Sequence, residues 1–259
     1  MVEALKYRIR SWERAGRHPA LTRAATFLWL SFQNARDRLF MGRVRDAIAR
    51  DKVPGNPDGA VRAVCEDALG AGIRPMQCPR ELAALIGEVD AARPRSVLEI
   101  GTARGGTLFL LCRFAAPDAT IVSVDLPYGR NGGGYPRWKE RDYRGFARDG
   151  QALHLLRADS HAQATVADVA ALGGERGFDF ILIDADHSYE GVRRDYLNYR
   201  PLLAEGGLLA LHDVLPNTGD PSIDVNRFWI ELENDPGVRT ETIVTDPDQG
   251  MYGIGLVRG

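Results

Sequence analysis

The chain has 259 residues, which is enough for one large α/β domain with an appendage and too few for two full domains. Hydrophobic residues make up 44% and charged residues 26% of the sequence, a globular balance that argues against wholesale disorder. The net charge of −2 argues against nucleic acid as a partner.

The first fifty residues differ in charge from the rest of the chain. They hold 11 Lys and Arg against 4 Asp and Glu, a balance of +7, which leaves −9 on the remainder. Apolar residues recur among the arginines at mixed spacings, and residues 3–50 are predicted to be helical. Because the segment is too aromatic for a free tail, we expect it to pack against another subunit or to cover a substrate pocket. A solvated basic helix, or one that meets a phosphate or membrane surface, is the alternative. The aromatic residues are Trp12, Phe27, Trp29, Phe32 and Phe40.

The N-terminal sequence does not predict export or membrane insertion. Charged residues stand where a signal peptide needs an apolar stretch, and the most apolar run, residues 24–30, is far below the roughly 20 residues of a membrane span. The three cysteines, Cys65, Cys78 and Cys112, have no metal-type spacing and are too few for a disulfide framework. We therefore expect a cytoplasmic protein without a transmembrane segment.

A turn-rich stretch, residues 53–59, separates this segment from the rest. Helices are predicted over residues 60–69 and from Pro79 to residue 92. From there, short apolar strands alternate with helices, which predicts a mostly parallel sheet covered on both faces. The predicted strands are residues 96–100, 120–126, 154–158, 178–183 and 208–211, and the predicted helices are residues 107–115 and 189–203.

The chain closes with two further apolar segments, residues 240–246 and 252–259. Too few residues separate them for a crossover helix, so they are predicted to form an antiparallel pair at one edge of the sheet. The expected fold class is a Rossmann-like α/β sheet of seven mostly parallel strands with an antiparallel edge strand. Helices would cover both faces, and a helical extension would precede the sheet.

The first predicted strand runs into the glycine-rich turn EIGTARGG. Small residues let this backbone approach a ligand, and the next helix directs its N-terminal amides toward it. Asp125 ends the second strand, where a carboxylate accepts both hydroxyls of a ribose. Dehydrogenases and methyltransferases share this arrangement, and Ala103 breaks the G-x-G-x-x-G pattern of the former. A purely structural turn is the competing interpretation.

These segments resemble a known family. VLEIGTARGG is similar to the first motif of class I S-adenosylmethionine-dependent methyltransferases, SVDL to their ribose-binding strand end, and RADS, residues 157–160, to their adenine-contacting segment. The run FILIDADHSYEGVRRDYLNYRPLLAEGGLLALHDV resembles a bacterial small-molecule O-methyltransferase subfamily, related to macrocin- and catechol-type enzymes and to cephalosporin hydroxylase-like proteins. The likeness covers residues 76–259, so we expect a methyltransferase domain there and a helical extension over residues 1–75.

The resemblance implies S-adenosylmethionine as the cofactor. The alanine at position 103 replaces the middle glycine of the family motif, at the methionine end of the expected pocket. The residues expected to contact the cofactor are Glu99, Gly101, Thr102, Ala103, Gly105, Asp125, Asp159, Ser160 and Asp184.

Titratable side chains follow the fourth and fifth predicted strands. Asp184, Asp186 and His187 come after the fourth strand, and His212 and Asp213 after the fifth. In the strand order expected for this fold, the two strands are neighbours about 4.8 Å apart. Their carboxyl ends face the cofactor crevice, so we expect the acids and imidazoles to converge there.

In the catechol-type relatives the equivalent positions hold magnesium, so the resemblance implies Asp184, His212 and Asp213 as metal ligands. A histidine suits manganese, iron or zinc better than magnesium, so either the metal differs or His212 is not a ligand. Alternatively, the two acids cap helices. His187 lies where the family has a lysine near the methyl acceptor, which suggests a general base, with His212 as the next candidate. A histidine hydrogen-bonded at a helix start is the other interpretation.

The sequence therefore predicts methyl transfer from S-adenosylmethionine to a small molecule, such as a hydroxyl of a sugar or secondary metabolite, by a homo-oligomer. The segment 127–138 is predicted to be a lid or a substrate wall, and a surface insertion is the alternative. Two other functions stay open: a non-catalytic or hydroxylase-associated protein that keeps the cofactor fold, and an NAD-dependent oxidoreductase.

Overall fold

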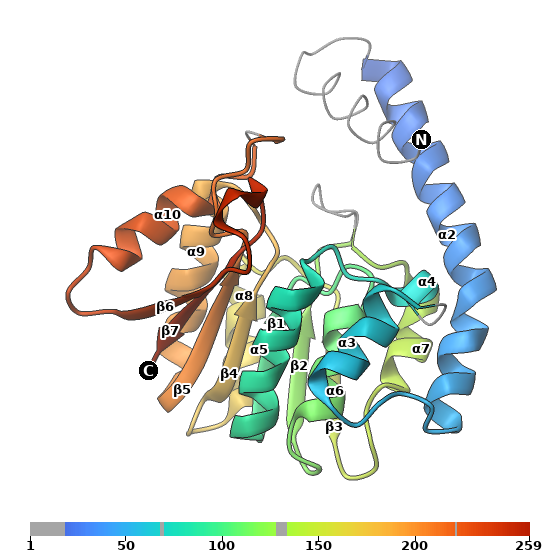
Figure 1. The fold of residues 1–259 in the computed structure, drawn as a ribbon, viewed down its shortest axis with the longest axis horizontal. Helices are drawn as coiled ribbons and strands as arrows, with labels where there is room; N and C mark the ends of the chain where they lie inside the picture. The colour runs from blue at the N-terminus through green and yellow to red at the C-terminus, as the bar shows by residue number, and fades with distance from the viewer. Residues whose placement is uncertain (1–18, 68–69, 128–133, 221) are drawn as a thin grey trace.

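The computed structural model describes residues 19–67, 70–127, 134–220 and 222–259 (Figure 1). Seven strands form one sheet in the order β3-β2-β1-β4-β5-β7-β6. This order confirms the predicted seven-stranded, Rossmann-like fold. The strands are β1 (Ser96–Ile100), β2 (Thr120–Val124), β3 (Ala152–Leu156), β4 (Phe178–Ile183), β5 (Leu203–His212), β6 (Arg239–Ile243) and β7 (Ile254–Arg258).

The strand directions follow from the lengths of the connections. β1 to β5 pair in parallel, because each connection between them contains a helix that returns the chain to the same end of the sheet. Between β6 and β7 lies only a short 3₁₀ turn, Pro247–Gln249, so β7 runs antiparallel to β6 and also to β5. The predicted antiparallel pair at the edge is confirmed.

Helices cover both faces of the sheet, as Figure 1 shows. One face packs against α3 (Pro57–Cys65), α5 (Pro79–Ala92) and α6 (Gly106–Phe114), and the other against α8 (Gln163–Gly173), α9 (Tyr189–Tyr199) and α10 (Val225–Glu233). Successive strand residues alternate between two cores: Val97 belongs to the first and Leu98 to the second. Because both faces are buried, the strands read as continuous apolar runs.

The N-terminal helix α2 (Pro19–Ala49) confirms the predicted helix over these residues; residues 3–18 lie outside the described chain. Met41 and Val44 are buried in the core on the α3, α5 and α6 face of the sheet, and α2 packs there against α4 (Gly70–Ile73). The earlier turns of α2 extend beyond the sheet in Figure 1. Of the five predicted aromatic contacts, only the side chains of Phe32 and Phe40 are described, and Phe32 is exposed.

Most elements differ from their predicted bounds by a few residues, and β3, β5 and α9 show the physical reasons. β3 begins and ends two residues early, because its register with β2 pairs Thr120 with Ala152 and Val124 with Leu156. β5 is longer, since Leu203 already pairs with β4 before a register shift. α9 ends before a 3₁₀ turn, Arg200–Leu202, because Pro201 cannot donate the next helical hydrogen bond. No helix among the described residues is long and apolar enough to cross a membrane.

Candidate functional site

The carboxyl ends of β4 and β5 place the candidate reaction centre. Ile183 ends β4 and pairs with Leu211 of β5, so Asp184 and His212 leave the sheet side by side. The Asp184 N–H donates to the Ile100 carbonyl at 2.8 Å, which holds this position in line with the end of β1. The expected convergence therefore follows from the strand register alone.

The predicted acids and imidazoles meet at this edge. His212 Nδ1 lies 3.2 Å from Asp184 Oδ1 and 3.5 Å from Asp213 Oδ1. His187 Nδ1 lies 2.9 Å from Asp213 Oδ2, and its Nε2 lies 3.5 Å from Asp184 Oδ1. We call these four residues the acid–imidazole cluster. The structure thus brings together all the residues predicted as metal ligands or catalytic groups.

The charges within the cluster depend on one another. Burial alone would lower the pKa of His212, but the carboxylates of Asp184 and Asp213 outweigh it and raise that pKa well above its usual value. Burial would raise the pKa of Asp213, but the two imidazoles outweigh it and hold it below the usual range. The pKa of His187 is raised in spite of burial, because Asp213 accepts its hydrogen bond. In each case groups of opposite charge shift the pKa against the effect of burial.

The donor set fits a divalent metal ion. One ligand atom from each of Asp184, His212 and Asp213 lies within 4.8 Å of the others. His212 is buried, and within the described residues neither of its ring nitrogens makes a well-aligned hydrogen bond. A buried imidazole nitrogen without such a bond is costly, and a metal would satisfy it. Two carboxylates with one imidazole suit manganese, iron or zinc.

Asp186 does not join the cluster. Its Oδ1 accepts hydrogen bonds from the Ser188 N–H at 3.0 Å and the Ser188 hydroxyl at 2.8 Å. Ser188 in turn caps the N-terminus of α9 by accepting the Gly191 N–H. The helix-capping interpretation therefore describes Asp186, whereas Asp184 is directed toward the imidazoles.

Gln77 is a site residue that the sequence did not point to. It precedes α5, is 8% exposed, and its Nε2 donates to Asp184 Oδ2 at 2.7 Å. Its Oε1 is buried and has no hydrogen-bond partner among the described residues, so it can accept one from a ligand. No motif surrounds this glutamine; only the packing of α5 on the sheet brings it to the cluster.

Three residues of the glycine-rich turn have positive φ angles, and only two of the three are glycines. Gly101 has φ +100° and a side chain there would meet the Asp184 carbonyl at 2.0 Å, so the turn and the cluster are in direct contact. Gly105, at φ +85°, faces the Tyr143 ring. Ala103 keeps a left-handed φ of 43° although it is not glycine, which costs about 1–2 kcal/mol. Strain of this kind is common at ligand sites.

Glu99 lies beneath this turn in a buried polar chain. The Ser123 hydroxyl donates to Glu99 Oε2 at 2.7 Å and makes a further hydrogen bond with the Thr102 hydroxyl. Burial raises the pKa of Glu99 to about 8, so this carboxyl is neutral at physiological pH. Sequence reasoning passed over Ser123, although a polar residue inside the apolar run TIVSVDL was visible.

Asp125 follows β2, as predicted. Burial raises its pKa to about 6, and its Oδ2 accepts the Tyr135 N–H at 2.8 Å. The Tyr135 ring is buried against Tyr143, so it belongs to the core rather than to an open substrate wall. Residues 128–133 of the predicted lid lie outside the described chain.

Asp159 and Ser160 lie on the loop after β3. The Asp159 carboxylate accepts the His161 N–H at 2.9 Å within that loop. The Ser160 carbonyl accepts the Tyr199 hydroxyl of α9 at 2.8 Å. Both hydrogen bonds are local to this end of the sheet, and the cofactor contacts of the two residues stay a prediction.

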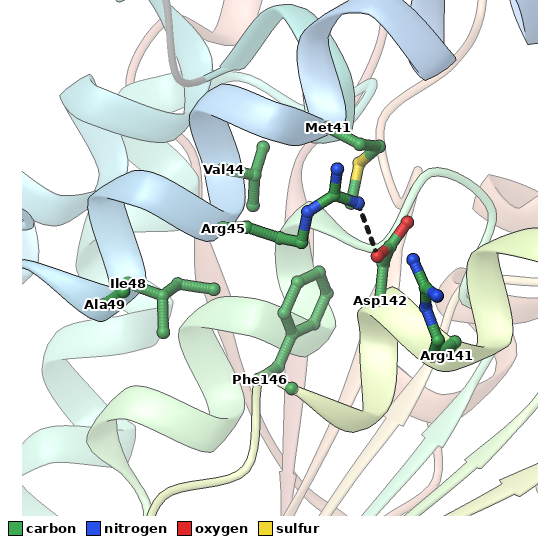
Figure 2. A pocket seen from close by; sticks show the side chains of 9 residues that line it. Met41, Val44, Arg45, Ile48, Ala49, Arg141, Asp142 and Phe146 are labelled. Carbon is green, nitrogen blue, oxygen red and sulfur yellow. Dashed lines mark hydrogen bonds and ion pairs between the residues drawn. The ribbon is translucent and has the colours of Figure 1, made fainter.

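The cavity in Figure 2 lies elsewhere, between α2 and the segment 141–146. It measures about 280 Å³ and is lined by apolar side chains such as Met41, Ile48 and Phe146. Arg45 Nη1 and Asp142 Oδ1 form a 2.8 Å ion pair there. None of its lining residues belongs to the acid–imidazole cluster, so it is separate from the candidate site.

Comparison with known proteins supports the fold described above, and one match spans the glycine-rich turn. Residues 98–214, from β1 to just beyond β5, match the model of the methyltransferase domain family. The segment that carries the glycine-rich turn and the acid–imidazole cluster is therefore similar to a methyltransferase domain. Together with the strand order, this confirms the predicted fold class, a Rossmann-like sheet of the methyltransferase type.

Individual relatives are distant. The O-methyltransferase from Bacillus cereus, solved with S-adenosylhomocysteine, is similar at a TM-score of 0.52 and 17% identity over 85% of this chain and 90% of that one. TomG from Streptomyces achromogenes, an O-methyltransferase of tomaymycin synthesis solved with S-adenosylmethionine, is similar at a TM-score of 0.50 and 19% identity over 71% and 81%. The uncharacterized protein y4gI of Sinorhizobium fredii (strain NBRC 101917 / NGR234) is 26% identical over 147 residues, 56% of this chain. That alignment spans only 16% of the relative's length.

Proposed function

We propose that this chain transfers a methyl group from S-adenosylmethionine to a hydroxyl of a small molecule. The observation that carries the proposal is the direct contact between the glycine-rich turn and the acid–imidazole cluster, at Gly101 and Asp184. A cofactor on that turn would present its methyl group next to acids and imidazoles. The ligands named for the B. cereus and S. achromogenes structures support this choice of cofactor.

The reaction needs alignment and the removal of one proton. The sulfonium of the cofactor is already activated, so placing the acceptor oxygen in line with the methyl carbon supplies the largest share of the rate. Asp125 would hold the ribose through its carboxylate, whose Oδ2 the Tyr135 N–H fixes in place. His187 would accept the hydroxyl proton, and Asp213 orients its ring through the 2.9 Å contact at Nδ1.

A divalent ion held by Asp184, His212 and Asp213 would polarise the acceptor hydroxyl and so favour its deprotonation. Gln77 would then fix the free oxygen of Asp184. Binding of Mn²⁺ to the purified protein, followed by calorimetry, tests the assignment. Asp184→Asn should abolish binding, whereas Asp186→Asn, the matched change in the same loop, should leave it intact. Equal binding by both variants, or none by the wild type, would remove the metal from the proposal.

An NAD-dependent oxidoreductase is the competing class, and the sequence does contain the Tyr-x-x-x-Lys spacing of short-chain dehydrogenases, in Tyr135 and Lys139. In the structure, Lys139 Nζ lies 2.6 Å from Asp37 Oδ2 and is almost fully buried. The Tyr135 hydroxyl is buried as well. These placements favour a structural role for the pair and support methyl transfer over hydride transfer.

Calorimetric titration with S-adenosylhomocysteine and with NAD separates the two classes. We expect the first to bind and the second not. Asp125→Ala should weaken S-adenosylhomocysteine binding by ten- to a hundredfold, since a charge-assisted hydrogen bond contributes about 1.5–3 kcal/mol. Asp149→Ala, at an exposed loop position, is the control. Tight binding of NAD alone would exclude the proposed reaction.

We also propose that the protein is a homo-oligomer through the outer face of α2. Leu28, Phe32 and Leu39 are 67%, 57% and 79% exposed, and spacings of four and seven residues put them on one helix face. Met41 and Val44 face the core on the other side. A second copy is the occupant that charge favours, because residues 1–50 carry +7 and the remainder −9, so one copy's helix attracts another's body.

Charge and cysteine content support two further parts of the proposal. The acidic remainder of the chain disfavours nucleic acid as a partner. Cys65, Cys78 and Cys112 are all free thiols, and two of them are buried, which fits a reducing compartment such as the cytoplasm.

A further inference from the structure

Asp37 is a buried carboxylate on the inner side of α2, and its contacts reach both segments that flank the proposed cofactor site. It is 4% exposed. Its Oδ1 lies 2.7 Å from Arg104 Nη2, and its Oδ2 lies 2.6 Å from Lys139 Nζ. Arg104 and Lys139 are 35 residues apart in sequence, and one side chain of the N-terminal helix joins them.

Arg104 belongs to the glycine-rich turn. It stands between Ala103, whose left-handed backbone is strained, and Gly105. Its Nη2 also donates to the Ala71 carbonyl in α4 at 2.8 Å. The conformation of the turn is therefore stabilised by more than its own hydrogen bonds, because the Arg104 side chain binds both α2 and α4.

Lys139 holds the segment 134–139 to α2 through its ion pair with Asp37. It ends the 3₁₀ turn Arg137–Lys139 and is 2% exposed. Tyr135, four residues before it, donates its N–H to Asp125 Oδ2. The segment 134–139 thus links the Asp37 carboxylate to the carboxylate proposed to hold the ribose.

We propose that Asp37 is a positioning residue of the cofactor site, which holds the turn 101–105 and the segment 134–139 at a fixed separation. The inference rests on the proposed function, because it concerns the cofactor of that reaction. Arg104 and Lys139 share the Asp37 carboxylate, and Arg36 Nη2 also lies 3.6 Å from its Oδ1. Among the ion pairs of the described residues, neither Arg104 nor Lys139 has another partner of opposite charge. Loss of the Asp37 charge should therefore release both segments together.

The chain offers a matched control. Arg45 lies two turns further along α2 and pairs with Asp142 Oδ1 at 2.8 Å, across the cavity in Figure 2. This pair also fastens α2 to the body but touches neither the turn 101–105 nor the segment 134–139. We therefore expect Arg45→Gln to loosen α2 while both ion pairs of Asp37 stay in place.

The experiment compares wild type, Asp37→Asn and Arg45→Gln in the full chain. Hydrogen–deuterium exchange without ligand should rise in peptides covering 100–106 and 134–140 in Asp37→Asn, and should stay at the wild-type level there in Arg45→Gln. Calorimetry with S-adenosylhomocysteine should show affinity at least tenfold weaker for Asp37→Asn and within twofold of wild type for Arg45→Gln. Asp37→Glu, which keeps the charge, should recover part of the loss.

The positioning role would be overturned if Asp37→Asn exchanged at the wild-type rate in both segments. Equal affinity losses in Asp37→Asn and Arg45→Gln would overturn it as well. If wild type itself fails to bind S-adenosylhomocysteine, the proposed function falls, and the exchange data still decide whether Asp37 holds the two segments. If Asp37→Asn does not fold, Lys139→Met takes its place. It should speed exchange in 134–140 and leave 100–106 unchanged, and faster exchange in neither segment would overturn the inference.

Discussion

Glu99 lies at the end of β1 without exposed surface, and burial raises its pKa to about 8. In the unfolded chain a glutamate has a pKa near 4.3. Between these values the folded state binds a proton that the unfolded state releases. The free energy of unfolding should therefore fall as the pH rises from about 4.5 to about 8. Urea unfolding of the ligand-free protein at pH 5, 7 and 9 measures this.

Glu99→Gln is the reference for this measurement, since it keeps the shape of the neutral carboxyl and cannot ionise. Wild type and Glu99→Gln should be similar in stability at pH 5, and the variant should be the more stable at pH 9. Parallel stability curves for the two proteins across this range would show that Glu99 keeps an ordinary pKa in the fold.

His187 is the residue on which the proposed proton transfer depends. His187→Ala should lower kcat by roughly 10²-fold or more while the affinity for S-adenosylhomocysteine changes little, because the imidazole acts on the acceptor. Labelled S-adenosylmethionine with a metabolite panel supplies the assay. His154→Ala, on β3, serves as the control. Near-normal turnover in His187→Ala would return this histidine to a structural role and leave His212 as the candidate base.

At the scale of elements, the junction of β1 and β4 depends on Gly101. A side chain there would meet the Asp184 carbonyl at 2.0 Å, and φ is +100°. Gly101→Ala should therefore force the strand ends apart, lower stability by more than about 1–3 kcal/mol, and abolish cofactor binding. Chemical unfolding measures the loss of stability.

Gly174→Ala separates the effect of positive φ from the effect of the close contact with Asp184. Gly174 also has positive φ, +66°, but a side chain there meets nothing within 4 Å. Its backbone, at φ +66° and ψ −169°, lies in a region that is essentially open to glycine alone, so Gly174→Ala should lose only the backbone cost, about 1–3 kcal/mol. The difference between the two variants measures the close contact at Gly101, and equal losses would show that the strand ends can move apart freely.

At the scale of the whole molecule, the outer face of α2 predicts self-association. Leu39→Asp should shift the protein toward monomer, because it places a charge in the centre of the proposed interface. Light scattering after size exclusion gives the mass. Ile230→Asp, at another exposed apolar position on α10, should leave the mass unchanged. A wild-type protein that is monomeric at tens of micromolar would refute the interface.

The sequence by itself determined the order of elements and the fold class. Apolar runs such as 96–100 and 178–183 are buried on both faces, and a local pattern shows this without knowledge of any partner. The register of neighbouring strands then placed Asp184 beside His212, so the convergence of the cluster could be predicted from strand order. The exact ends of the strands did not follow from the sequence, because pairing with a neighbouring strand decides where a strand ends, as for β3 with β2.

Only the tertiary structure decided the contacts between segments distant in sequence. Gln77 reaches Asp184 across 107 residues and Asp37 reaches Lys139 across 102. No spacing rule predicts such pairs, since they depend on how α5 and α2 pack on the sheet. Tyr135 shows the same limit: its sequence fits an open loop, but its ring is buried against Tyr143. Burial and pairing of individual side chains are properties of the packed molecule, whereas periodicity records only which face is apolar.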